Sequence, residues 1–184
     1  MSKLQERYPR DKKIKIAVVS LWYFLLMMSV AAVQICIFPR FKFFGTVADA
    51  MLCTVVIVAF LSNEKEASLF AFFGGIVIEA MGSTGISLLP LIYFITAYFL
   101  GSAARYNHKK IFPSYLVFAA FGTIVRIVTT LAYTALVATR FNLLDVLKKS
   151  ALPEALATLI CAVVAYYPIG WICRKIRKNL EEGK

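Results

Sequence analysis

The chain has 184 residues, of which 60% are hydrophobic, and it carries a formal net charge of +11. A soluble domain of this length could not cover so much apolar surface with its polar residues, so the composition excludes a soluble globular protein. The charge does not indicate nucleic-acid binding, because cations that flank membrane spans and contact anionic lipid headgroups account for it.

The apolar residues come in blocks of about the length that a helix needs to cross a bilayer, roughly 17 to 25 residues. These blocks predict an all-α integral membrane protein, a single bundle of six transmembrane helices with no soluble domain on either side. The third helix is expected to end at a tight turn, Gly82–Gly85, whose glycines give the backbone freedom that a short reversal needs. In chain order the predicted helices are Ile16–Phe38, Thr46–Leu61, Ala67–Met81, Ser87–Ala104, Ser114–Ala138 and Pro153–Cys173.

Lysine and arginine set the expected orientation. Most of the 21 such residues lie in the segments 1–15 and 174–184 or in the second and fourth connections. The bias of positive charge toward the cytoplasm therefore predicts two basic cytoplasmic tails, with the bundle between them at 16–173. On the outer side, Pro39–Phe44 mixes aromatic and basic residues, and Asn142–Lys149 is predicted to form a short amphipathic helix on the leaflet surface.

Four charged residues fall within the predicted spans: Asp49, Glu79, Arg126 and Glu154. Charges at membrane depth are costly and usually meet partners inside the bundle. Arg126 and Glu79 each lie twelve residues into helices that run the same way, so both are expected about 18 Å above the cytoplasmic helix starts. The two would meet if the third and fifth helices are neighbours. Asp49 and Glu154 would enter from the outer ends of the second and sixth helices.

Small and polar residues recur on one face of each of three helices, and such faces let transmembrane helices approach closely. The faces predicted to turn inward are Ala71, Gly75, Glu79 and Gly82; Ala119, Gly122, Arg126, Thr129, Thr130 and Tyr133; and Glu154, Thr158, Cys161, Ala162 and Ala165. Two interpretations of the charged cluster stay open: an ion-pair core that fixes helix register, and a solute or ion site open to the outside. If Glu79 faces water instead, Arg126 has only Asp49 or Glu154 within reach.

The sequence shows no pattern typical of catalysis, of a metal site or of a bound cofactor. The four cysteines, Cys36, Cys53, Cys161 and Cys173, are isolated within apolar segments and are interpreted as packing residues. His108 is the single histidine and stands in a basic connection. The sequence therefore predicts a protein that is not an enzyme.

The stretch from about Val33 to Arg105 resembles the bacterial rod shape-determining protein family MreD. The resemblance is carried by Phe38-Pro39, Ala48-Asp49, the run Gly74–Glu79, Gly85–Leu89 and Tyr98–Gly101. The family usually has aspartate at the position of Glu79 and often proline at that of Ala48. The resemblance implies a scaffold of the cell-wall elongation machinery in the bacterial cytoplasmic membrane. It also implies the partners MreC and, through MreC, the actin-like MreB and RodA with its penicillin-binding transpeptidase.

The alternative is a substrate-binding S-component of an energy-coupling-factor vitamin transporter. These components have a similar six-helix size and topology, and the MreD family is thought to share their fold. Their first helix typically carries an Ala-x-x-x-Ala coupling motif. Here Ala17 is followed four residues later by Leu21, and Ala31 by Ile35. The missing motif favours the scaffold.

Overall fold

The computed structural model describes residues 2–40, 46–82, 88–106, 111–137 and 147–181, and every regular element in these ranges is helical. This confirms the all-α prediction. The predicted turn at 83–85, His108, and residues 41–44 and 142–146 of the two outer connections lie outside the described residues. The helices are α1 (Ser2–Ala32), α2 (Ala50–Leu61), α3 (Glu64–Gly82), α4 (Leu89–Tyr106), α5 (Phe112–Val137) and α7 (Leu152–Glu181).

The helices at the two ends of the chain are longer than the apolar blocks predict. The basic segment before Ile16 continues α1 back to Ser2, and α7 extends past Cys173 to Glu181. Lysine, arginine and glutamate, which are frequent in both extensions, are good helix formers, so the helices do not stop where the apolar residues do. After Ala32, α1 continues through a π-helical turn, Val33–Ile37, and a 3₁₀ turn, Phe38–Arg40.

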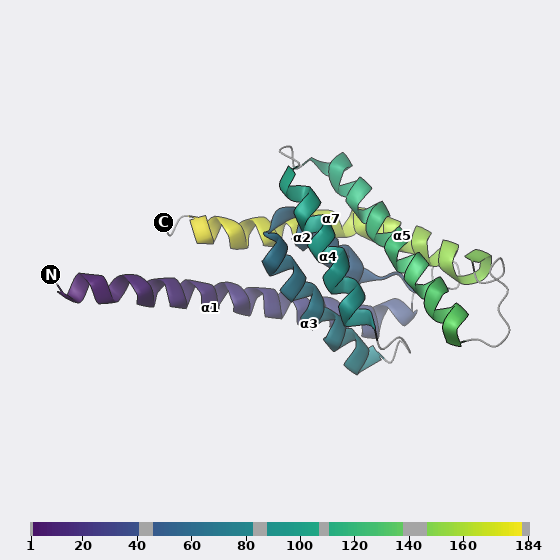
Figure 1. Cartoon of the computed structure of the whole chain (residues 1–184), viewed down its shortest axis with the longest axis horizontal. Helices are drawn as coiled ribbons and strands as arrows, with labels where there is room; N and C mark the ends of the chain where they lie inside the picture. The colour runs from purple at the N-terminus through teal and green to yellow at the C-terminus, as the bar shows by residue number, and fades with distance from the viewer. Residues whose placement is uncertain (1, 41–45, 83–87, 107–110, 138–146, 182–184) are drawn as a thin grey trace.

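Three segments are long and apolar enough to cross a membrane: Ala17–Arg40, Phe112–Leu136 and Leu152–Ile176. Figure 1 shows α1 and α7 running in opposite directions, with the two ends of the chain at the same end of the molecule. By length and composition the chain is therefore a membrane protein with three candidate spans among its described residues.

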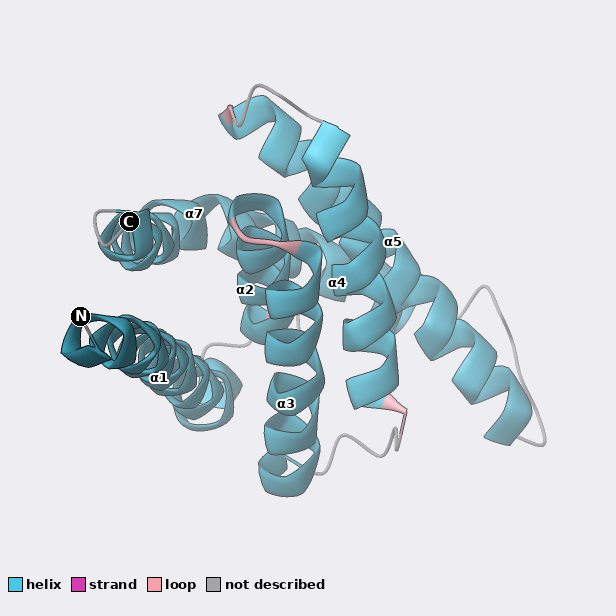
Figure 2. Cartoon of the chain, turned by 60° about the vertical axis from the view of Figure 1, so that its left-hand side comes forward, coloured by secondary structure: helices cyan, strands magenta, loops and turns pink. Residues whose placement is uncertain are grey.

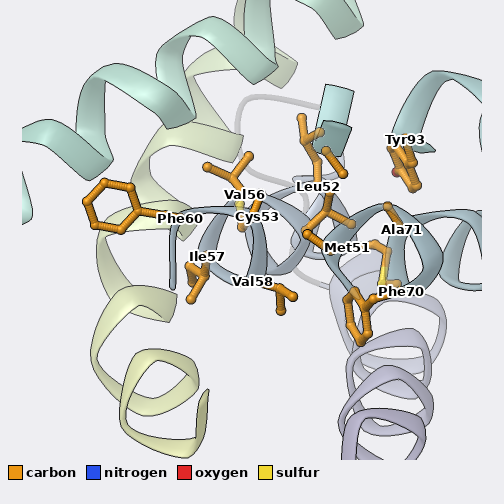
Figure 3. Packing of buried hydrophobic residues seen from close by; sticks show 14 of the residues in the cluster. Met51, Leu52, Cys53, Val56, Ile57, Val58, Phe60, Phe70, Ala71 and Tyr93 are labelled. Carbon is orange, nitrogen blue, oxygen red and sulfur yellow. The ribbon is translucent and has the colours of Figure 1, made fainter. Parts of the chain in front are cut away.

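Helix α2 is the centre of the structure. All twelve of its residues are buried, and it packs against α1, α3, α4, α5 and α7. A helix that is apolar on every side is stable only when it is enclosed. Its length of about 18 Å is well short of a bilayer core of roughly 30 Å. Figure 3 shows its side chains extending in all directions, with Phe60 near one end and Met51 and Leu52 near the other.

Helices α3 and α4 pack against each other along their length. Gly75 makes this possible, because a Cβ atom there would lie 2.5 Å from the Cα of Pro90. Farther along the same contact, a Cβ atom on Gly101 would lie 2.9 Å from the Cα of Glu64. Figure 2 shows α4 between α3 and α5. This arrangement determines which charged residues can meet.

Candidate functional site

Asp49 is the N-cap residue of α2, directly before its first helical residue, and is 3% exposed. Its Oδ1 accepts a hydrogen bond from the backbone N–H of Leu52 (2.9 Å), and its Oδ2 accepts one from the hydroxyl of Tyr93 (2.5 Å). The side chain of Gln34 accepts the N–H of Met51 (2.7 Å). Because the first turn of α2 is buried, its free N–H groups need such partners from side chains.

Arg126 reaches this helix start from α5. Its Nε lies 3.6 Å from Oδ2 of Asp49 and 3.7 Å from Oε1 of Glu154, which is in the first turn of α7. The Arg126 side chain is 12% exposed and that of Glu154 is 24% exposed. Each carboxylate also lies at a helix N-terminus, where the helix dipole favours negative charge. One guanidinium thus joins α5 to the starts of α2 and α7.

Thr158 connects α7 to α2 beside this ion cluster of Asp49, Arg126 and Glu154. Its hydroxyl accepts the N–H of Asp49 (3.2 Å) and donates to the backbone carbonyl of Glu154 (2.7 Å). The thiol of Cys53 donates to the backbone carbonyl of Thr158 (3.3 Å). A polar seam therefore runs along the contact between the central helix and the last helix.

Glu79 does not join the cluster. Among the described residues its side chain has no ion pair, and α3 is not packed against α5. The reason is the placement of α4 between these two helices, which Figures 1 and 2 both show. The predicted pairing of Glu79 with Arg126 is wrong. Arg126 instead has the partners that the sequence analysis gave for a Glu79 that does not reach it.

The predicted inward faces are buried in part. Ala71, Ala119, Thr158 and Ala162 are buried, and a Cβ atom on Gly122 would lie 3.1 Å from Val56 of α2. Thr129, Thr130 and Tyr133 are half-buried. Three residues that contribute to the site were not predicted: Gln34, Tyr93 and Thr123. They carry no charge, and nothing in their spacing distinguishes them from ordinary residues of an apolar helix.

A small cavity lies beside Arg126, between α5 and α7. It has room for about one water molecule. Its lining combines polar and apolar side chains: Leu52, Thr123, Arg126, Ile127, Thr130, Ala151, Glu154, Ala155 and Thr158. A site of this size cannot enclose a metabolite, since small-molecule pockets typically occupy about 300–1,000 Å³.

Within the described ranges, no three His, Cys, Asp or Glu side chains lie close enough together to hold a metal ion. The four cysteines are free thiols; Cys53 and Cys173 are buried, Cys161 is half-buried and Cys36 is exposed. What this arrangement can do is chemically simple. It fixes the relative positions of three helices through charge and hydrogen bonds.

Comparison with protein-family models, with curated proteins and with solved structures finds no match to this chain.

Proposed function

We propose that all six helices belong to one integral bundle in the bacterial cytoplasmic membrane, with both termini in the cytoplasm. Two observations support this. The start of α1 and the end of α7 lie at the same end of the molecule (Figure 1), and the basic residues of 2–15 and 174–181 are at that end. Helices α3 and α4 also carry large exposed apolar side chains, as lipid-facing helices do: Leu69, Phe72, Phe73, Ile76, Leu91, Ile95, Tyr98 and Phe99.

Within that membrane, the chain acts as a non-enzymatic scaffold of the cell-wall elongation machinery, in the manner of the MreD family that it resembles. It binds MreC by helix-to-helix contact and, through MreC, reaches MreB, RodA and the penicillin-binding transpeptidase. The cluster around Arg126 serves packing in this proposal and does not bind a solute.

One observation carries the proposal: four of the described residues behind the resemblance, one carboxylate and three glycines, are helix-packing residues. Asp49 caps α2 and pairs with Arg126. Gly74 lies against Met51, Gly75 against the backbone of α4, and Gly101 against the start of α3. Residues that hold helices in register are expected in a protein that acts by presenting a fixed surface to its partners.

The size of the cavity argues against the S-component alternative in the form in which the ion cluster holds the vitamin. A vitamin needs a pocket that covers most of its surface, whereas the space beside Arg126 has room for about one water molecule. The guanidinium that would attract an anionic vitamin is already paired with two carboxylates of the same chain.

Affinity purification from native membranes tests the proposal. The full chain with an affinity tag is extracted in mild detergent, and the co-purified proteins are identified by mass spectrometry. Recovery of MreC together with RodA or its transpeptidase supports the scaffold. Recovery of transporter ATPases with a bound vitamin supports the alternative, and recovery of neither set refutes the scaffold.

A matched control separates specific partners from proteins that adhere to apolar surfaces. The Arg126→Leu variant keeps every exposed apolar residue but loses the cation that joins α5 to α2 and α7. Specific partners should be depleted when equal amounts of this variant are purified. Proteins that adhere to apolar surface should be recovered with the variant at least as well as with the unmodified chain, because the variant is the less stable of the two.

A further inference from the structure

The guanidinium of Arg126 has unused hydrogen-bonding capacity at the cavity between α5 and α7. Its Nε and Nη1 are buried and donate no hydrogen bond to any described residue. The two carboxylate oxygens near Nε lie at 3.6 and 3.7 Å, beyond the usual N–H···O range of about 2.7–3.2 Å. Buried donors are costly without an acceptor, so these two call for one.

The other polar groups around the cavity are acceptors that can take a hydrogen bond from a donor. The hydroxyls of Thr123, Thr130 and Thr158 each donate to the backbone carbonyl four residues earlier, at 2.8, 2.9 and 2.7 Å. Their hydrogens are therefore committed, and only their oxygens can serve the cavity, as acceptors. Glu154 contributes carboxylate oxygens, which accept as well when ionised.

A ligand that satisfies this lining must accept from Arg126 and donate to the threonine and carboxylate oxygens. An anion such as chloride cannot donate, and it would lie beside the negative charge of Glu154. A metal cation or ammonium would lie beside the guanidinium. The cavity is partly open, and the space within it accommodates about one water molecule.

We propose that the cavity binds a single structural water molecule that bridges Arg126 to the hydroxyl and carboxylate oxygens of α5 and α7. The water completes the ion cluster by hydrogen bonds where its direct contacts are too long. Ordered waters commonly serve otherwise unpaired buried groups in this way. The inference goes beyond the proposed function, because it concerns the bundle interior and holds for any external partner.

Two threonine-to-valine substitutions on α5 test it. Thr130→Val keeps the side-chain volume but removes an acceptor from the cavity. Thr134→Val is the matched control, because Thr134 makes the same bond to the carbonyl four residues earlier (2.7 Å) and does not line the cavity. If the water is bound, Thr130→Val should lower the thermal unfolding midpoint by about 2–4 °C relative to Thr134→Val.

Equal midpoints for the two variants, or a higher midpoint for Thr130→Val, would show that the cavity is dry and overturn the proposal. A high-resolution experimental structure of the unmodified chain gives an independent readout that does not depend on the variants folding. Density for a water within hydrogen-bond distance of Arg126 supports the proposal. Density for a bromide ion at this position in a sample prepared with bromide contradicts the proposal. The absence of any density there contradicts it as well.

Discussion

The removal of the charge on Arg126 should be the most damaging single change in the interior. Arg126→Leu replaces the cation with an apolar side chain of smaller size and leaves Asp49 and Glu154 without it. At an effective dielectric constant of about 20, unit charges 3.6 Å apart attract by roughly 4–5 kcal/mol. The contact to Glu154, at 3.7 Å, is of similar strength before solvent screening.

Several terms reduce this total. Leucine does not carry the desolvation cost of a buried guanidinium, Asp49 keeps its bonds from Leu52 and Tyr93, and Glu154 is partly exposed. Loss of one partner from a buried ion pair typically costs about 3–5 kcal/mol. We expect a loss of that size in the free energy of unfolding, measured by titrating the purified chain from mild detergent into denaturing detergent.

Arg105→Leu is the matched control. Arg105 forms an ion pair with Glu64 at 3.0 Å, but its side chain is 75% exposed. Exposed pairs contribute less than about 1 kcal/mol, so this variant should unfold close to the unmodified chain. If Arg126→Leu and Arg105→Leu lose the same stability, the reasoning about the ion cluster is refuted.

Three further changes have distinct expected results. Gly75→Ala places a Cβ atom 2.5 Å from the backbone of α4 and should cost about 1–3 kcal/mol of unfolding free energy; at Gly170 the nearest atom is 3.5 Å away, so Gly170→Ala should be neutral or stabilising in the same titration. Tyr93→Phe removes a hydrogen bond to a buried carboxylate and should cost about 1.5–3 kcal/mol; a double-mutant cycle with Arg126→Leu should be non-additive, and strict additivity would contradict a shared network. Glu79→Gln should change unfolding by less than about 0.5 kcal/mol, because Glu79 has no ion pair among the described residues; a loss as large as that of Arg126→Leu would contradict its separation from the ion cluster.

The sequence was sufficient to identify the charged residues of the site, because a charge inside an apolar helix is rare and needs a partner. It did not predict which helices are neighbours. Glu79 and Arg126 were expected at one level, yet α4 separates their helices, while Asp49 and Glu154 approach from helix starts.

The neutral polar side chains that bond to the start of α2 could not be predicted from the sequence either. Tyr93 and Gln34 complete the start of α2, but tyrosine and glutamine occur in apolar helices for many reasons and carry no charge that calls for a partner. The helical extensions of α1 and α7 were missed because apolar blocks were used to set helix ends. Helix propensity in the basic segments gave the signal that would have found them.

The enclosure of α2 has a consequence for biogenesis. Ribosomes deliver α2 early, but α7, which supplies Glu154 and Thr158 to its start, leaves the exit tunnel after the other described helices. Until α7 has been made, the side of α2 that α7 will cover must face lipid or an insertion chaperone. Chains that terminate before α7 should consequently be recognised by membrane proteases as incomplete, even though five of the six described helices have been made.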